Sequence, residues 1–218
     1  MFTTAAAVHH VRRDAASALR SAAQAAELSR EHGFRLMLAW ATSYEGRALA
    51  DSGDYDRGLE LIGRGLASAR ATGSTLFLPF HLALLAEVHL RRGLPGEAAS
   101  VVADALAESE RQGERLCAAE LLRLRGETTA AASDDRRGCA RAENDLRTAI
   151  ETARGQGANL LTLRSAVSLA RLTRGTAAAV QALKHLHDAR ASVREGAQLP
   201  DVLEAEALLR STPRDRPG

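Results

Sequence analysis

The 218-residue sequence is short of the side chains from which β-sheets are built. Valine and isoleucine together supply 11 residues and the three aromatic types supply seven, whereas alanine supplies 45 and leucine 32. Strands favour β-branched and aromatic residues, while alanine and leucine are strong helix formers. The composition therefore argues against a β-sandwich, a barrel or a doubly wound sheet. It predicts an all-α protein whose helices pack in close contact.

The sequence also lacks a large net charge and has only two cysteines. The formal net charge is +2, and arginine and glutamate interleave along the chain. A nucleic-acid binder usually concentrates a basic excess in one patch, so we expect no nucleic-acid partner. Cys117 and Cys139 form no CxxC pair, which argues against a structural zinc site. Free thiols in a reducing cytosol are the expectation.

Long apolar runs are missing as well. No stretch approaches the roughly 18 consecutive apolar residues that a membrane span needs. The first ten residues carry no charge before a short apolar run and lack the long apolar core of a secretory signal. The sequence therefore predicts a cytoplasmic chain with no membrane segment.

What the sequence does contain is a glycine at a fixed spacing. Five glycines recur every 20 residues: Gly33, Gly53, Gly73, Gly93 and Gly113. Glycine is preferred just after a helix, where the chain turns left-handed. Between the glycines, apolar residues follow the i, i+3, i+4, i+7 spacing of one helix face. The pattern predicts helices of about 15–18 residues joined by tight turns.

Alternate helices resemble each other, so the repeating unit is a hairpin of 40 residues. Positions 40 apart pair small residues or residues of one kind: Gly46, Ala86 and Gly126; Gly58 and Ala98; Ile62 and Val102; Gly65 and Ala105. Small residues are needed where two helices approach closely, and this arrangement is typical of the tetratricopeptide (TPR) hairpin. The unit exceeds the usual length of about 34 residues. We therefore predict a TPR-like solenoid, a right-handed superhelix of hairpins about 40 residues long.

The predicted boundaries make residues 1–212 a single repeat domain. A leading helix is expected over 14–32, preceded by a frayed start that contains His9 and His10. The predicted hairpin units and cap are residues 34–72, 74–112, 114–156, 158–195 and a capping helix at 199–211. Within the third unit, the polar segment 133–138 is expected to be a lengthened turn. Residues 213–218 are expected to form a disordered tail.

Several runs resemble one known protein class. The segments are residues 31–42 (EHGFRLMLAWAT), 80–87 (FHLALLAE), 119–127 (AELLRLRGE), 163–172 (LRSAVSLARL) and 200–209 (PDVLEAEALL). They resemble the C-terminal TPR region of large bacterial signalling ATPases and class III adenylyl or guanylyl cyclase-like regulators. The resemblance covers roughly residues 5 to 210. It implies a helical-repeat tail, here without the ATPase and cyclase parts, and therefore a detached or truncated tail.

No pattern of catalytic or cofactor-binding residues accompanies the repeat. There is no Gly-x-x-x-x-Gly-Lys-Ser/Thr sequence, since Lys184 is the only lysine, so ATP hydrolysis by this chain is not expected. His81 and His89 are two helical turns apart, too far to chelate one ion, and no metal is expected. The many glutamates are interpreted as solvated helix faces. We predict no catalytic residue, no metal and no cofactor.

The remaining candidate site is the surface lined by the first helix of each hairpin. The repeat predicts a groove made by Trp40, Ser43, Arg47, Phe80, Ala83, Glu87, Leu90, Glu120, Arg123, Glu127, Arg164, Val167, Arg171 and Arg174. Because arginine binds carboxylates in bidentate fashion, one hypothesis is a peptide partner with an acidic portion. The alternative is an ordinary solvated face with internal Arg–Glu pairs.

The sequence thus predicts a non-catalytic protein-interaction module, a regulatory tail or an adaptor of a bacterial signalling system. A second hypothesis is a fragment of a nucleotide-dependent signalling enzyme or transcription regulator whose catalytic domain lies upstream. A third is a small-molecule sensor. An apolar edge at Phe2, Val8 and Val11 also suggests self-association.

Overall fold

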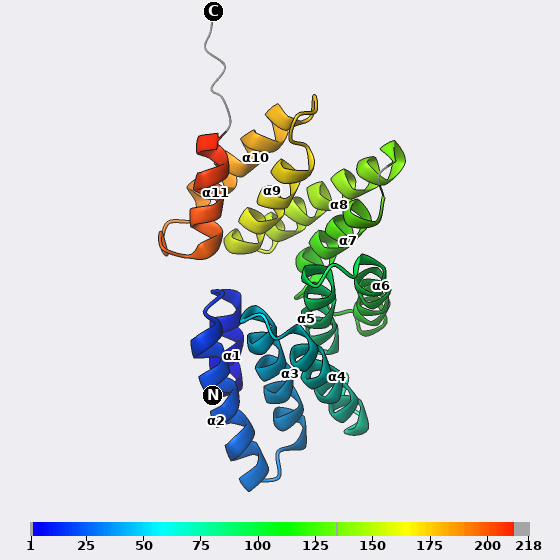
Figure 1. The fold of residues 1–218 in the computed structure, drawn as a ribbon, viewed down its shortest axis with the longest axis vertical. Coiled ribbons are helices and arrows are strands. Elements are labelled where there is room, and N and C mark those ends of the chain that lie inside the picture. Colours follow the sequence, from blue (N-terminus) through cyan, green and yellow to red (C-terminus); the bar gives the residue numbers. More distant parts are fainter. Residues whose placement is uncertain (1, 134, 212–218) are drawn as a thin grey trace, which may run out of the picture. The chain divides into compact units, whose positions relative to one another are not determined.

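The computed structural model describes residues 2–133 and 135–211, which contain no strand, as the composition predicts (Figure 1). The helices are α1 (Phe2–Val11), α2 (Ala15–Glu31), α3 (Arg35–Asp51), α4 (Tyr55–Ala71), α5 (Leu78–Arg91), α6 (Pro95–Gln112), α7 (Ala118–Ala132), α8 (Arg136–Gly155), α9 (Asn159–Leu172), α10 (Ala179–Ser192) and α11 (Pro200–Ser211). None of these helices is long and apolar enough to cross a membrane. The predicted tail, 213–218, lies outside the described residues.

Consecutive helices pack as antiparallel hairpins, and the chain divides into two compact units. Met1–Cys117 holds the hairpins α1–α2, α3–α4 and α5–α6. Ala118–Gly218 holds α7–α8, α9–α10 and the final helix α11, which packs on α9 and α10. We call these unit 1 and unit 2. The predictions that the chain is a single domain and that its hairpins form a right-handed superhelix concern both units together, and they stay predictions.

The turns lie where the glycine spacing predicts them. All five glycines of the 20-residue series have positive φ, from +66° at Gly113 to +100° at Gly53. This is the left-handed region, in which residues with a Cβ are strained. Each of these glycines directly follows a helix or the one residue after it, so the spacing sets the helix ends.

The close approach of paired helices is confirmed by the lack of space around three helical glycines. A Cβ built on Gly46 of α3 would lie 2.6 Å from the carbonyl oxygen of Gly58 on α4, and one on Gly58 would lie 2.7 Å from that of Gly46. On Gly65 it would lie 2.6 Å from the carbonyl oxygen of Ala39. The two backbones are thus in direct contact, with no room for a methyl group.

The start of the chain corrects the sequence prediction. Residues 2–11, expected to be frayed, form helix α1, which packs on α2 and makes a further hairpin ahead of the predicted units. Ala6 of α1 is fully buried against Ala22, Tyr44 and Leu84. The turn of this hairpin sits at Arg13, with φ 56°, one 20-residue step before Gly33. Arginine occupies the position where glycine would have revealed the repeat.

The third unit also differs from its predicted outline. The expected turn over 133–138 is shorter, because α8 already begins at Arg136. Asp135 is the N-cap, and its Oδ1 accepts a hydrogen bond 2.5 Å long from the Gly138 amide. N-cap carboxylates satisfy amides of the first turn that have no partner within the helix. A polar run therefore signalled a helix start as well as a turn.

Glycine substitutions on α4 test the close approach. We expect Gly65→Ala to lower the free energy of unfolding by about 2 kcal/mol, because its methyl group meets backbone and overpacks the contact. Gly63→Ala is the matched control: a Cβ there meets nothing within 4 Å, so it should stabilise the helix by about 0.5–1 kcal/mol. Urea denaturation measures both; equal effects would contradict the prediction.

Candidate binding site

The residues predicted to line a groove lie on or next to the first helices of the hairpins, α3, α5, α7 and α9, but half of them are buried. The buried members are Trp40, Ser43, Arg47, Ala83, Arg123, Arg164 and Val167, and only Arg171 and Arg174 are exposed. Seven of the 14 belong to unit 1 and seven to unit 2. A groove continuous through both units stays a prediction.

In unit 1, the arginine of this set is tied to the chain's own carboxylates. Arg47 Nε donates to Asp51 Oδ1 at 3.0 Å, and its guanidinium also binds Glu87 of α5. Arg91 of α5 in turn binds Asp51 of α3. The two pairs that join the helices, 47 with 87 and 51 with 91, each span 40 residues. The charges therefore follow the repeat and hold one hairpin to the next.

Burial and these partners act on Arg47 in opposite directions. Desolvation lowers the pKa of its guanidinium, but the carboxylates of Glu87 and Asp51 outweigh that effect and raise the pKa above its ordinary value. Arg47 therefore stays charged although it is only 3% exposed. A buried charge of this kind is stable only while its partners remain.

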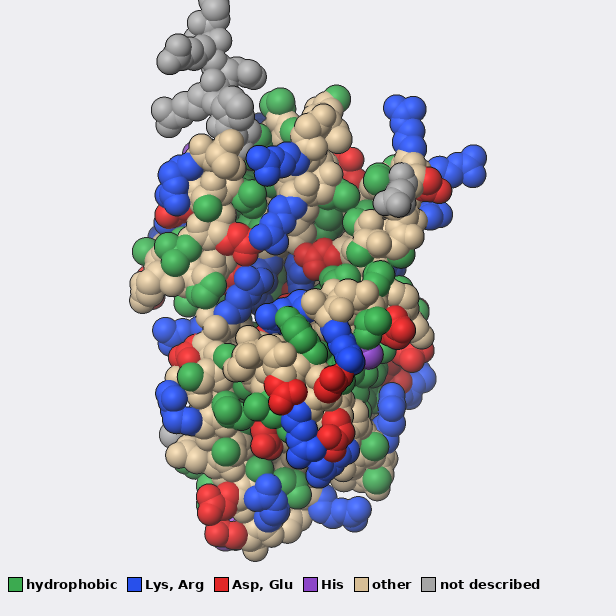
Figure 2. Space-filling model, viewed as in Figure 1, with side chains coloured by type: hydrophobic (Ala, Val, Ile, Leu, Met, Phe, Trp, Pro, Cys, Tyr) green, Lys and Arg blue, Asp and Glu red, His purple; other side chains and the backbone are tan. Residues whose placement is uncertain are grey.

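In unit 2 the arginines are engaged in the same way. Arg123 Nη1 binds Glu127 at 2.6 Å, and its Nε binds Glu120 at 3.0 Å. Arg164 forms a buried bidentate pair with Asp201 of α11, with Nη2 2.8 Å from Oδ2. These geometries agree with the alternative of internal pairs. Figure 2 likewise shows basic and acidic side chains intermixed on the visible face.

A cavity with mainly apolar walls lies in unit 1, among α1, α3 and α5. It has a volume of about 450 Å³. Its lining is Thr3, Thr4, Ala7, Val8, Val11, Arg12, Met37, Trp40, Tyr44, Phe77, Phe80, His81 and Leu116. Four of the chain's seven aromatic residues are in this set. Two of the predicted groove residues, Trp40 and Phe80, are therefore in the cavity lining.

The aromatic side chains form one continuous cluster. The rings of Trp40 and His81 are stacked, with centroids 5.8 Å apart and planes at 19°. Tyr44 and Phe80 meet the His81 ring edge to face at 5.3 and 5.7 Å. Phe77 meets Trp40 in the same manner at 5.3 Å. Offset and edge-to-face contacts are favourable for aromatic pairs, so the cavity wall is preorganised.

His81 is a polar residue of this cluster that has an incomplete set of hydrogen bonds. Its side chain is buried, and no hydrogen bond reaches its Nδ1 in the described part of the chain. Burial lowers the pKa of His81 to about 3, so the imidazole is neutral near pH 7. A neutral imidazole has one donor and one acceptor nitrogen.

The backbone at the cavity is strained. Phe77 precedes α5 with φ 55° and ψ 14°, a left-handed conformation that costs a residue with a Cβ about 1–2 kcal/mol. Its ring contacts Trp40 and lines the cavity. Strain of this kind is concentrated at functional sites.

Sequence reasoning missed Tyr44, Phe77 and His81. A signal was present, since Met37 and Phe77, like Trp40 and Phe80, are one 40-residue period apart and line the same cavity. It could not be interpreted without α1, which supplies Val8, Val11 and their neighbours.

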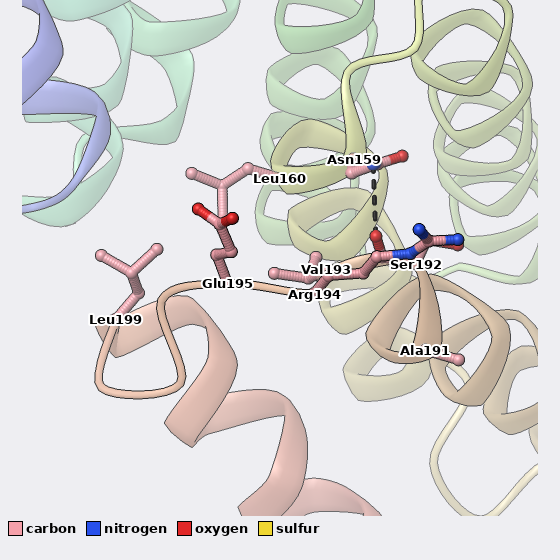
Figure 3. Close-up of a pocket in the computed structure, with 8 residues that line it drawn as sticks. All are labelled: Asn159, Leu160, Ala191, Ser192, Val193, Arg194, Glu195 and Leu199. Carbon is pink, nitrogen blue, oxygen red and sulfur yellow. Dashed lines mark hydrogen bonds between the residues drawn. The ribbon is translucent and has the colours of Figure 1, made fainter.

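A second, larger depression lies in unit 2 beside the connection between α10 and α11 (Figure 3). Its volume is about 850 Å³, and it is lined by Asn159, Leu160, Ala191, Ser192, Val193, Arg194, Glu195 and Leu199. Five of these eight residues are exposed. Asn159 Nδ2 donates to the Ser192 carbonyl oxygen at 3.2 Å. Figure 3 shows these side chains spread over the start of α9, the end of α10 and the connection that follows it, which is typical of an open surface hollow.

The described residues form no metal-binding cluster. Among them, no group of three or more histidine, cysteine, aspartate or glutamate side chains is arranged to hold a metal ion. Cys117 is buried and Cys139 is exposed, and neither forms a disulfide with the other.

The fold matches that of solved TPR-like repeat proteins. One is a structure of a Podosopora anserina protein described as a putative kinesin light chain with nearly identical TPR-like repeats, and another is a variant form of that protein. Both have a TM-score of 0.58 and 14% sequence identity to this chain. The matches cover 89% of this chain and 96% of the first structure, and 88% and 92% for the variant form. No family model and no curated protein matches the sequence. The chain therefore has a TPR-like fold.

The buried charge network of unit 1 predicts a large effect on stability. We expect Arg47→Ala to lower the free energy of unfolding by about 3 kcal/mol, because the partly buried carboxylates of Glu87 and Asp51 both lose the guanidinium of Arg47, and Arg91 then binds Asp51 alone. Arg57→Ala, which removes the exposed pair with Glu60 on α4, is the control and should change stability little. Urea denaturation compares them; a small loss for Arg47→Ala would contradict the prediction.

His81 predicts a pH dependence of stability. Its pKa is near 6.5 when unfolded and about 3 when folded, so the unfolded chain binds more protons between these values. The stability that this residue contributes is complete above pH 6.5. It decreases as the pH is lowered from 6.5 towards 3, by up to about 1.4 kcal/mol per pH unit. His81→Phe should flatten this slope, and the exposed His187→Phe should not. Denaturation at neutral pH and at mildly acidic pH measures it; parallel slopes for wild type and His81→Phe would refute it.

Proposed function

We propose that the chain is a non-catalytic protein-interaction module whose recognition face in unit 1 is the mouth of the aromatic cavity. The TPR-like fold supports this proposal, because helical-hairpin arrays of this kind typically present binding surfaces instead of catalytic sites. The observation that carries it is a convergence of exposed apolar side chains. Val8 (50% exposed), Phe77 (37%) and Leu116 (62%) come from three separate segments and line the same cavity.

The partner we propose is a peptide segment with large apolar side chains. Apolar residues that converge while exposed to water mark interaction sites. An acidic peptide has less support, because Arg47, Arg123 and Arg164 are bound to carboxylates of the chain itself. Among the described residues that line the cavity, Arg12 is the one that carries a charge. Self-association through the apolar edge of α1 stays a prediction, as does a cytoplasmic location.

The context we propose is a bacterial signalling system in which the module is a regulatory tail or an adaptor. This part depends on the resemblance of five segments to the TPR region of signalling ATPases and cyclase-like regulators. The second candidate, a fragment of a nucleotide-dependent enzyme or transcription regulator, depends on the same resemblance. The coding DNA ahead of Met1 distinguishes them: an in-frame P-loop or cyclase sequence would favour the fragment.

Selection of random peptides against the purified chain tests the recognition face. We expect enriched peptides to share large apolar residues and to bind Leu116→Asp at least about tenfold more weakly, because a carboxylate at the mouth opposes burial of apolar surface. Leu203→Asp is the matched control, since Leu203 is 51% exposed on α11 of unit 2. Fluorescence anisotropy measures the affinities. Peptides that bind both variants equally, or no enrichment, would disprove the assignment.

A further inference from the structure

We infer that the cavity among α1, α3 and α5 is a binding site for a small, uncharged ring compound that carries one hydrogen-bonding group. This goes beyond the proposed interaction function, because occupancy of the cavity requires no protein partner. The volume, about 450 Å³, falls within the range of about 300–1,000 Å³ typical of small-molecule sites. Such sites combine mostly apolar and aromatic walls with a few placed polar groups.

The walls favour a planar ring. Trp40 and His81 lie nearly parallel, and Tyr44 and Phe80 both meet the His81 ring. These aromatic side chains come from α3 and α5, and small residues such as Ala7 line the cavity on its α1 side. Planar ligands gain both apolar burial and favourable edge or face contacts against aromatic walls.

His81 accounts for the single hydrogen-bonding group. It lines the cavity, is only 3% exposed, and its Nδ1 has no hydrogen-bond partner among the described residues. A buried polar group without a partner is unfavourable, and a ligand that supplies one recovers that loss. Because Nδ1 is itself buried in this orientation of the ring, pairing with a ligand requires the imidazole to turn about its Cβ–Cγ bond.

The charges around the cavity account for the ligand being neutral. Within the part of the chain that the structure describes, no aspartate or glutamate belongs to the lining, and its one charged residue, Arg12, is exposed. A cation in the interior would lose its hydration without gaining a counter-charge, and an anion could reach only the exposed Arg12. An uncharged ligand avoids this loss.

Trp40 makes the site directly observable, because it is the chain's only tryptophan. Its indole N–H gives one signal in the nitrogen–proton NMR spectrum. The probes are 2-naphthol and 2-methylnaphthalene, which share a two-ring shape and differ by a hydroxyl in place of a methyl group. We expect 2-naphthol to shift the Trp40 signal saturably and to bind roughly tenfold more tightly, since only it pairs with His81. Protonated 2-naphthylmethylamine should bind more weakly than 2-naphthol.

Two variants distinguish the contribution of the His81 hydrogen bond from that of the cavity volume. His81→Phe should abolish the preference for 2-naphthol, whereas His89→Phe, the same change on α5 outside the cavity lining, should keep it. Ala7→Phe should fill the cavity and weaken both neutral probes, and Ala16→Phe on the exposed side of α2 should not. Circular dichroism establishes that each variant is folded; should His81→Phe fail to fold, the probe comparison in wild type and Ala7→Phe decides.

Four results would overturn the inference. They are no saturable shift of Trp40 by 2-naphthol, equal affinity for the two neutral probes in wild type, an undiminished preference in folded His81→Phe, and tighter binding of the protonated amine. No peptide takes part in this experiment. A failure here therefore leaves the proposed interaction face standing, and a failure of the peptide selection leaves this site standing.

Discussion

The direct contact of paired helix backbones is the constraint on which the rest of the structure depends. Gly46 and Gly58 each lie where a Cβ would collide with the carbonyl oxygen of the other. At equivalent positions of the next hairpin, Ala86 and Ala98 are completely buried. Helices this close leave no space for large side chains between them. The abundance of alanine and the shortage of aromatic residues both follow from that geometry.

Contacts between one hairpin and the next depend on side chains that face the neighbouring hairpin. In unit 1, the pairs Arg47–Glu87 and Asp51–Arg91 join α3 to α5. A guanidinium as deeply buried as Arg47 must keep its partners, because an unpaired buried charge is strongly destabilising. Arg47, which the repeat predicts on a groove surface, therefore has a structural role, and the recognition face that we propose lies instead at the apolar cavity.

The apolar cavity contains two energetically unfavourable features. Phe77 holds a left-handed backbone conformation, and His81 is buried without a partner for its Nδ1 among the described residues. Both lie on the cavity that collects four of the seven aromatic residues. Local departures from good packing and hydrogen bonding are expected where a protein binds something. The proposals of an interaction face and of a small-molecule site both rest on this concentration.

The sequence by itself determined the helices, their ends and the small residues between them, because left-handed turns and close backbones restrict single positions to glycine or alanine. It missed α1, since Arg13 stands where the turn glycine would be and the Ala-rich helix ahead of it has little amphipathic pattern. Only the tertiary structure decided that Arg47 of α3 binds Glu87 of α5 and that His81 of α5 lies against Trp40 and Tyr44 of α3. Such contacts join side chains from different helices, and their choice depends on distances that no local pattern encodes.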